Sequence, residues 1–369
     1  MRQTEIVKTG IQRALGPILA GYAFQQTALT GMLPVIAEEL DLTPGRVGLA
    51  VGVGLLVSSV IAPFLVGGMT RQWLRVAMAV QMLASLALMG LLLVPAPAVA
   101  AFALLLAIRI VQGTAAAATL AVAQGASASV GRPVAALARL QIGPGLGRAF
   151  GAALIGPLVR LSIVIPLLPA LIGATVSLFL LARTDWCLPM TTGHHERTPW
   201  TAALAVPFLV QCAVGAGQLG LGPLLAQNFP APRAAAIAGL CLGTGYLALM
   251  LAHVFVTPVS TGIRPAATLL VAALFLPVLW PQPAVLVVAT ALAAGTSGVI
   301  IARHLARVIS LRPAAARRNA AWQGSALLAG LGIGASAASL CLPLSPVAPF
   351  LLACGFALAA LLICKRTLR

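Results

Sequence analysis

The sequence predicts an all-α membrane protein with about twelve transmembrane helices in two six-helix halves. Of its 369 residues, 60% are hydrophobic and only 8% are charged, whereas soluble domains carry about 25% charged residues. The apolar residues form long runs, and ~20 helical residues cross the ~30 Å hydrocarbon core of a bilayer. The basic residues gather on alternate loops, as they do on the cytoplasmic side of membrane proteins.

Charged residues, proline pairs and glycines divide the chain into the expected spans. These lie near Ala14–Ala37, Val47–Met69, Val76–Val94, Val99–Ala121, Leu140–Leu158, Ile163–Leu181, Ala202–Leu225, Ala234–Phe255, Ala266–Trp280, Ala284–Ile301, Ala321–Leu342 and Val347–Cys364. The basic residues before the first span resemble the start of a signal peptide. The apolar stretch continues to about Ile36, which is too long for a signal peptide, so we interpret it as an uncleaved first helix.

The basic residues orient these spans. If the N-terminus is cytoplasmic, only Arg46, Arg160 and Arg233 of the 23 Lys and Arg residues fall in outside loops. Arg109 and Arg148 fall within spans, and all the others lie inside. This asymmetry places both termini in the cytoplasm and requires an even number of helices. A pI near 11.6 therefore reflects basic cytoplasmic loops and not a nucleic-acid partner.

The other titratable residues indicate neither a metal nor a cofactor. The six cysteines form no C-x-x-C pair and lie mostly in apolar runs, so we interpret them as small packing residues. The four histidines show no ligand spacing. All six acids, Glu5, Glu38, Glu39, Asp41, Asp185 and Glu196, fall in termini or loops of this map. No expected span therefore has a carboxylate in its middle.

The chain divides into an N-terminal half over residues 1–182, a cytoplasmic loop over 183–200 and a C-terminal half over 201–369. The pattern P-x-x-A-x-x-[LF] ends both the first span, from Pro34, and the seventh, from Pro223. Gly54 and Gly243 are separated by the same number of residues as these prolines. Halves that repeat in the same orientation are typical of transporters whose binding site lies between them.

The fourth expected span contains Arg109-Ile-Val-Gln112-Gly113. An arginine near the middle of a span costs about 2.5–3.5 kcal/mol on insertion scales, so such residues face a protein interior or a wet cavity. Gln112 shares the helical face of Arg109, and Gly113 allows a neighbouring backbone to come close. The alternative is a structural arginine that ties helices together.

Three motifs make the chain similar to the major facilitator superfamily of secondary transporters over nearly its whole length. Leu33–Pro44 resembles the family's junction between helices one and two. Arg109-x-x-Gln112-Gly113 resembles its fourth-helix motif, in which the arginine is linked to proton coupling. Gly143-Pro144-Gly145-Leu-Gly147 resembles the fifth-helix motif of the drug and metabolite antiporters. The resemblance implies a two-half transporter fold, alternating access and efflux.

Two positions depart from the family pattern. The loop between helices two and three normally reads G-x-x-x-D-x-x-G-R, and here it runs from Gly67-Gly68 to Arg75 with Arg71 in place of the aspartate. In the family that aspartate helps to lock one conformation. In the fifth span, Arg148 stands where the motif usually has a second glycine.

The candidate site residues are the polar side chains inside the spans. For substrate binding or coupling these are Gln25, Gln26, Arg109, Gln112, Gln141, Arg148, Gln211, Gln218, Tyr246 and His253, with Tyr22, Trp322 and Gln323 as further polar residues. For gating or helix packing they are Gly113, Gly143, Pro144, Gly147, Gly67, Gly68, Arg71 and Arg75. A glutamine can equally serve as an interhelical hydrogen bond, and the glycines can serve packing alone.

Charge indicates the substrate class. Two intramembrane arginines face no intramembrane carboxylate, and buried charge requires a partner. A substrate with carboxylates can supply one, because the guanidinium binds carboxylate or phosphate in a bidentate manner. We therefore expect a monomeric exporter of a small organic anion or zwitterion, such as a carboxylate siderophore, in a bacterial inner membrane. A cationic drug would be unexpected without a membrane-embedded acid.

Several alternatives remain open at this stage. Proton coupling would have to use His253, the boundary acids Glu38, Glu39 and Asp41, or the substrate itself, because arginine stays protonated. A multidrug antiporter, an importer of small metabolites and an uncoupled exporter are alternatives within transport. A membrane enzyme is disfavoured, since the spans hold neither an H-E-x-x-H motif nor clustered acids. Short loops disfavour a sensor or scaffold.

Overall fold

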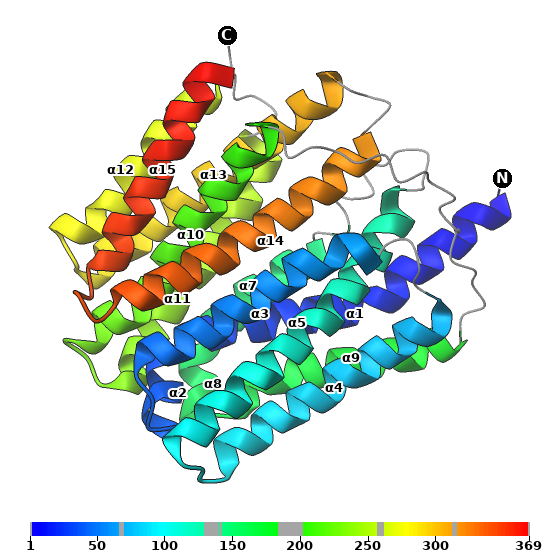
Figure 1. The fold of residues 1–369 in the computed structure, drawn as a ribbon, viewed down its shortest axis with the longest axis horizontal. Helices are drawn as coiled ribbons and strands as arrows, with labels where there is room; N and C mark the ends of the chain where they lie inside the picture. The colour runs from blue at the N-terminus through cyan, green and yellow to red at the C-terminus, as the bar shows by residue number, and fades with distance from the viewer. Residues whose placement is uncertain are drawn as a thin grey trace.

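The helices of this protein lie side by side along one direction, and the chain enters and leaves the bundle at the same end (Figure 1). The computed structural model describes residues 2–65, 70–128, 140, 142–183, 202–256, 262–311 and 316–367, and its regular structure in these ranges is helical. Gly67, Gly68, Gln141 and nearly all of the expected central loop lie outside the described residues.

The first set of helices precedes the central loop. It comprises α1 (Arg2–Gly31), α2 (Leu33–Glu39), α3 (Pro44–Leu65), α4 (Arg71–Leu93), α5 (Ala98–Ala128), α7 (Ile142–Ala153), α8 (Ile155–Leu161), η1 (Ile165–Leu167) and α9 (Leu168–Arg183). The second set comprises α10 (Ala202–Ala226), α11 (Ala231–Leu251), η2 (Ala252–Val256), α12 (Ile263–Leu279), α13 (Pro283–Leu311), α14 (Ala316–Cys341) and α15 (Ala348–Thr367). We call these the N-terminal set and the C-terminal set.

A helix overlaps each of the twelve expected ranges. Among the described residues, eight helices are long and apolar enough to cross a membrane, and the bent pair α7–α8 raises that number to nine. Helix α12 and the apolar part of α15, Ala348–Cys364, are apolar but shorter. Helix α1 is not among them, because polar residues such as Gln25, Gln26 and Thr27 lower its hydropathy. The count of twelve spans stays a prediction.

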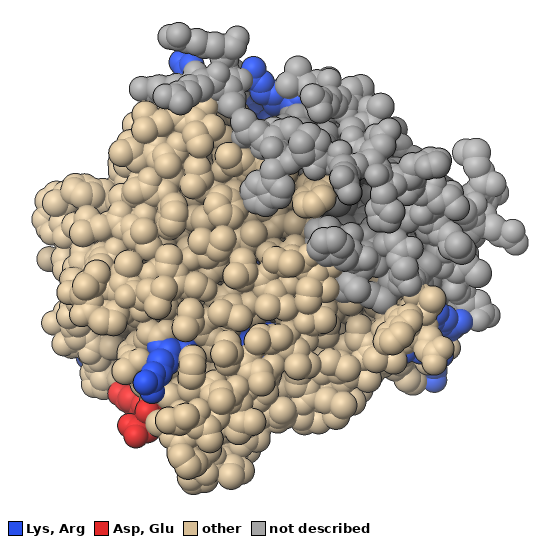
Figure 2. Space-filling model, viewed as in Figure 1, with Lys and Arg blue, Asp and Glu red and all other residues tan. Residues whose placement is uncertain are grey.

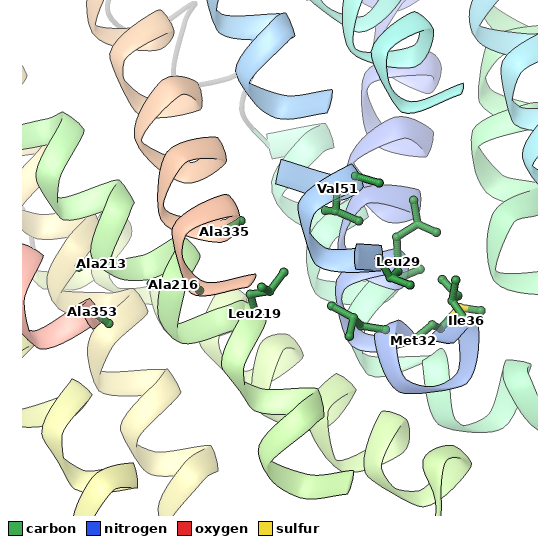
Figure 3. Packing of buried hydrophobic residues seen from close by; sticks show 14 of the residues in the cluster. Leu29, Met32, Ile36, Val51, Ala213, Ala216, Leu219, Ala335 and Ala353 are labelled. Atoms are coloured by element: carbon green, nitrogen blue, oxygen red, sulfur yellow. The ribbon is translucent and has the colours of Figure 1, made fainter. Parts of the chain in front are cut away.

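The two sets meet along two related contacts, in which α3 packs on α14 and α7 packs on α11. One hydrophobic core cluster runs through both sets. In Figure 3 it extends from Met32 and Val51 in the N-terminal set to Leu219, Ala335 and Ala353 in the C-terminal set. The repeated sequence segments also meet, because a Cβ on Gly222 would lie 3.0 Å from the ring of Pro34.

Small residues make these helix contacts close. Apolar side chains gain little by leaving lipid for a protein interior, so helix association there depends on tight packing of small residues. Ala28, Ala213, Ala338 and Ala353 are fully buried. On α7, a Cβ on Gly147 would overlap the carbonyl oxygen of Ala20 on α1. Glycine is therefore required there for the two backbones to touch.

The junction at Leu33–Pro44 forms a compact helix ending. Helix α2 ends at Glu39, and Asp41 adopts a left-handed conformation with φ 50°. The amide of Leu42 donates to the carbonyl of Ala37 at 2.8 Å. This is the Schellman pattern, in which a left-handed residue after the helix lets the chain reverse and satisfies the last carbonyls. Pro44 then begins α3, a position where a missing N–H costs nothing.

A 60° bend separates α7 from α8 at Leu154. Pro157 lies four residues after Ala153, so its ring would clash with the Ala153 carbonyl in a straight helix and cannot bond to it. Pro144 of the glycine-proline motif lies in α7, ten residues before this bend.

We predict that Gly147→Ala lowers the thermal stability of the protein and that Gly143→Ala does not. The added methyl at position 147 meets a backbone carbonyl, and such overpacking costs about 1–3 kcal/mol. At position 143 the nearest atom lies 3.8 Å from the added Cβ, which is ordinary contact. Thermal unfolding of the purified variants in detergent measures both effects, and equal midpoints would refute the close α1–α7 contact.

Candidate functional site

Arg109 lies at the centre of a buried polar cluster between α1 and α5. Its side chain is 0% exposed. The guanidinium donates through Nη1 to Oε1 of Gln112 at 2.6 Å and through Nη2 to Oε1 of Gln26 at 2.7 Å. Gln112 is one helical turn further along α5, as the i, i+3 spacing predicts. Both partners are uncharged amides, so the positive charge is hydrogen-bonded but not neutralised.

The cluster continues to α4 through weaker contacts. Nε2 of Gln112 lies 3.4 Å from both Oε1 of Gln25 and Oγ of Ser85. The hydroxyl of Ser85 donates to the backbone carbonyl of Gln81 at 2.9 Å. Gln25, Gln81, Ser85 and Gln112 are all buried. Sequence reasoning missed Gln81 and Ser85, although a glutamine inside the third expected span was a usable signal.

Gly113 lies where α5 approaches α3. A Cβ on Gly113 would overlap the carbonyl oxygen of Gly54. The hydroxyl of Ser58 donates to the carbonyls of Gly54 at 2.9 Å and Gly113 at 2.8 Å, and so bridges the two helices. This close contact fixes the position of Gly113, the residue after Gln112, against α3.

Arg148, the second arginine, lies on α7 where the N-terminal and C-terminal sets meet. Its guanidinium carbon is 6.0 Å from the ring centroid of Tyr246 on α11, which is within the range of a cation–π contact. The Tyr246 hydroxyl donates to Oε1 of Gln218 on α10 at 3.4 Å. Arg148 is half-buried, unlike Arg109. The sequence-predicted residues Arg148, Gln218 and Tyr246 therefore come together across the two sets.

The remaining predicted residues lie apart from these two clusters. Gln211 packs beside Gly330 of α14, and the exposed His253 on η2 lies near Gly298 of α13. Nε2 of Gln323 donates to the carbonyl of Ile301 at 3.3 Å, which joins α14 to α13. Trp322 is half-buried next to it. The structure thus places Gln211, His253 and Gln323 in contacts between helices of the C-terminal set.

The basic loop motif forms a helix-end contact. Arg71 begins α4, and its Nη2 donates to the carbonyl of Leu181 near the end of α9 at 3.0 Å. A cation is stabilised at a helix C-terminus, where the unpaired carbonyls concentrate negative charge. Arg75, one turn later, is exposed. Arg71 stands where the family pattern has an aspartate, and an ionised aspartate could not donate this hydrogen bond.

Carboxylates lie away from both arginines in the described part of the chain. Glu38, Glu39 and Asp41 are exposed at the turn between α2 and α3, and Figure 2 shows the acidic side chains gathered at one margin of the molecule. No ion pair to Arg109 or Arg148 occurs among the described residues. Within the same residues, no three His, Cys, Asp or Glu side chains form a group that could hold a metal.

The arrangement of helices matches that of solved transporters. A bacterial homologue of the iron transporter ferroportin in an inward-facing state superposes with a TM-score of 0.68 at 13% identity, covering 98% of each chain. The human organic anion transporter MFSD10 (TETRAN) gives 0.66 at 17% identity, covering 98% of this chain and 99% of its own. The nucleoside transporter NupG gives 0.66 at 12% identity, covering 97% of this chain and 100% of its own.

These likenesses, together with the apolar helices, define a multi-pass membrane protein with the major facilitator fold. No family model matches the sequence, and no curated protein matches it either. At 12–17% identity the likeness establishes the fold alone. The function of the protein is therefore inferred from its own side chains.

We predict that Gln26→Leu destabilises the protein by about 1–3 kcal/mol, because it leaves a donor of a fully buried guanidinium without an acceptor. Gln72→Leu is the matched control, since Gln72 is exposed on α4 and exposed substitutions change stability by less than about 0.5 kcal/mol. Unfolding midpoints of the two purified variants test this expectation. A Gln26→Leu midpoint no lower than that of Gln72→Leu would contradict it.

Proposed function

We propose that this protein is a secondary transporter that exports a small organic anion or zwitterion by alternating access across a bacterial inner membrane. The observation that carries the proposal is the position of Arg148. It lies between the two sets of helices, where transporters of this architecture bind substrate. Its neighbour Tyr246 and Gln218, to which Tyr246 is hydrogen-bonded, are uncharged.

Arg148 favours an anion as cargo. A half-buried guanidinium without a carboxylate nearby is unfavourable unless an anion joins it. Arginine holds carboxylates through two parallel hydrogen bonds, and Tyr246 and Gln218 add a hydroxyl and an amide beside it. By their names, the structural neighbours transport iron, nucleosides and organic anions. The fold therefore does not select among cargoes, and the choice rests on Arg148.

The contacts between the two sets suit a repeated opening and closing. Along α3, Gly45, Gly48 and Gly52 pack against Ser339, Ser336 and Gly332 of α14. Along α7, Ala153 packs against Gly243 of α11, with 3.1 Å between the Ala153 Cβ and a Cβ added at Gly243. Contacts between small residues separate without withdrawing long interlocked side chains, and rigid sets of helices can then rock about the site.

Coupling and direction are inferred from the fifth-helix motif and from the placement of the titratable residues. Export follows from the resemblance of Gly143–Gly147 to the fifth-helix motif of the efflux branch. Glu38, Glu39 and Asp41 are exposed at one end of the bundle, and His253 belongs to no cluster with Arg148. Of the coupling routes open from the sequence, a proton carried by the anionic substrate fits this placement, since it requires no titratable residue at the site.

We predict that Arg148→Gln strongly lowers export and that Arg160→Gln does not. In a strain that lacks the protein, one anionic compound should disappear from the medium and accumulate inside the cells. The wild-type chain and Arg160→Gln should restore export, because Arg160 is exposed at the end of α8. Arg148→Gln should lower transport about 10- to 100-fold, the effect of losing a charge-assisted hydrogen bond. Metabolite profiles of cells and medium measure both.

A different outcome would favour the rival functions. Unchanged secreted metabolites together with sensitivity to cationic dyes would replace the anion exporter with a multidrug antiporter. Accumulation of a compound in the medium, and its loss from cells, would indicate an importer. Either result would remove the role that we assign to Arg148 as an anion contact during export.

We predict that a disulfide between Ala153→Cys and Gly243→Cys stops transport reversibly. The 3.1 Å separation at these positions is a few tenths of an ångström below the usual Cβ–Cβ range of a disulfide, so a small shift of either helix suffices. The native cysteines should first be replaced by alanine. Oxidised vesicles should show no substrate movement, and reductant should restore it, whereas each single variant should be indifferent to oxidant. Full transport by the cross-linked protein would exclude separation of α7 and α11.

A further inference from the structure

Three arginines gather where α4 begins and α9 ends. Arg71 is the first residue of α4, and its Nη2 donates to the carbonyl of Leu181 on α9 at 3.0 Å. Arg75 lies one turn further along α4, and Arg183 is the last residue of α9. The side chains of Arg75 and Arg183 are exposed. Figure 2 shows basic side chains at this margin of the molecule.

Two contacts fix the level of Arg75 relative to α9. One is the hydrogen bond from the first residue of α4 to the last turn of α9. In the other, the Thr175 hydroxyl of α9 donates to Sδ of Met82 on α4 at 3.6 Å. The two helices are therefore antiparallel, and Arg75 lies between these contacts. It faces the last two turns of α9, which end at Arg183, so two long basic side chains extend from the same level of the bundle.

Arg183 lies on the lipid-facing side of α9. The exposed residues Ile172, Val176, Phe179 and Arg183 recur at the spacing of one helical face. The Arg183 guanidinium carbon lies 4.0 Å from the ring centroid of Phe179, which is a cation–π contact. The ring covers one face of the guanidinium, so the N–H groups at its edge remain available to an oxygen acceptor.

Neighbouring residues of α4 mark the level of the lipid headgroups. Trp73, in the first turn of α4, is 63% exposed, and tryptophan is enriched at the boundary between membrane and water. Arginine near a helix end extends to the same level. Further along α4, Val76 and Leu83 are exposed. The surface thus combines basic groups at headgroup level with apolar side chains at the depth of the acyl chains.

The charge of this surface is complementary to phosphate. The carboxylate side chains that the structure describes, Glu38, Glu39 and Asp41, lie at the turn between α2 and α3. Helix α3 runs the length of the bundle between that turn and the start of α4. Within the described part of the chain, no carboxylate therefore balances Arg75 or Arg183. Arginine holds phosphate oxygens through paired hydrogen bonds.

We infer that the surface formed by the start of α4 and the end of α9 binds an anionic phospholipid. Arg75 and Arg183 hold its phosphate, and the exposed apolar faces of the two helices lie along its acyl chains. A lipid fits this surface better than free phosphate does, because the apolar faces continue from the arginines into the membrane. The site lies on the lipid-facing surface of the N-terminal set and does not depend on the proposed cargo or direction of transport.

The first test measures unfolding in the presence of lipid. The full-length protein, delipidated in a neutral detergent, should be titrated with dioleoylphosphatidylglycerol and, in parallel, with dioleoylphosphatidylcholine. We expect a saturable rise of about 2 °C or more in the unfolding midpoint with the anionic lipid alone, because a ligand of the folded state stabilises it. Glycerol phosphate, which has the charge without acyl chains, should give no rise. Absence of the rise, an equal rise with both lipids, or a rise with glycerol phosphate would overturn the inference.

Paired variants locate the lipid on the protein. Arg75→Gln combined with Arg183→Gln should raise the phosphatidylglycerol concentration at half-effect about 10-fold or more, since each basic residue near an anionic surface contributes about fivefold. Arg46→Gln combined with Arg160→Gln removes the same charge from exposed positions at the other end of the bundle and should change nothing. Native mass spectrometry should show phosphatidylglycerol retained by the control pair and lost from the first pair. Equal affinity and retention in the two pairs would exclude this site.

All four substitutions replace exposed side chains, and such changes shift stability by less than about half of the smallest cost expected for a buried group. Both paired variants should therefore fold, which makes the comparison between them decisive. The same titration of Phe179→Leu tests the stacked geometry, because Arg183 keeps its charge and loses only the ring beneath it. We expect weaker phosphatidylglycerol binding there than in the control pair, and unchanged binding would contradict a role for the stacked guanidinium.

Discussion

A positive charge that cannot leave the membrane interior is the constraint on which the N-terminal set depends. Arg109 stays protonated in any protein environment, so the surrounding helices must supply what water would have supplied. Gln26 from α1 and Gln112 from α5 meet its two terminal nitrogens, and Ser85 from α4 reaches the same network. Because unpaired donors are so costly there, the network fixes how these three helices are rotated about their own axes, which non-directional apolar contacts cannot do.

Helix α1 links this network to the contact between the two sets. Gln26 accepts from Arg109 on α5, and the next residue, Thr27, donates through its hydroxyl to the backbone carbonyl of Arg148 on α7 at 3.1 Å. Adjacent residues of a helix point about 100° apart, so one turn of α1 touches both arginine-bearing helices. Gly147 keeps α7 tight against α1 at Ala20. A rotation of α1 would therefore disturb both arginines together, which gives coupling between them a physical route.

Much of this organisation could be predicted from sequence, because it depends on local pattern. Hydropathy located the helices, and i, i+3 spacing paired Arg109 with Gln112. The partners of Arg109 on other helices could be narrowed to the polar residues within spans. The sequence could not select among these residues, because the choice depends on how each helix is rotated about its axis. Gln81 and Ser85 were missed for that reason, although their type and depth were visible. The bend at Leu154 was not predicted, because Pro144 and Pro157 both lie in this span and the sequence alone does not show at which proline a helix bends.

The two arginines also show that charge in the sequence does not assign a role to a residue by itself. The burial of each side chain in the fold is needed as well. Both lie in spans without carboxylates, so at the level of sequence one explanation, an anionic substrate, covers both. Burial distinguishes them: Arg109 is fully buried and its hydrogen-bond partners Gln26 and Gln112 belong to the N-terminal set, whereas Arg148 is half-buried beside Tyr246 of the other set. Contacts within one set persist when the sets move, so Arg109 keeps these partners. A group between the sets changes its neighbours when they move, and only there can binding of an anion favour one conformation over the other.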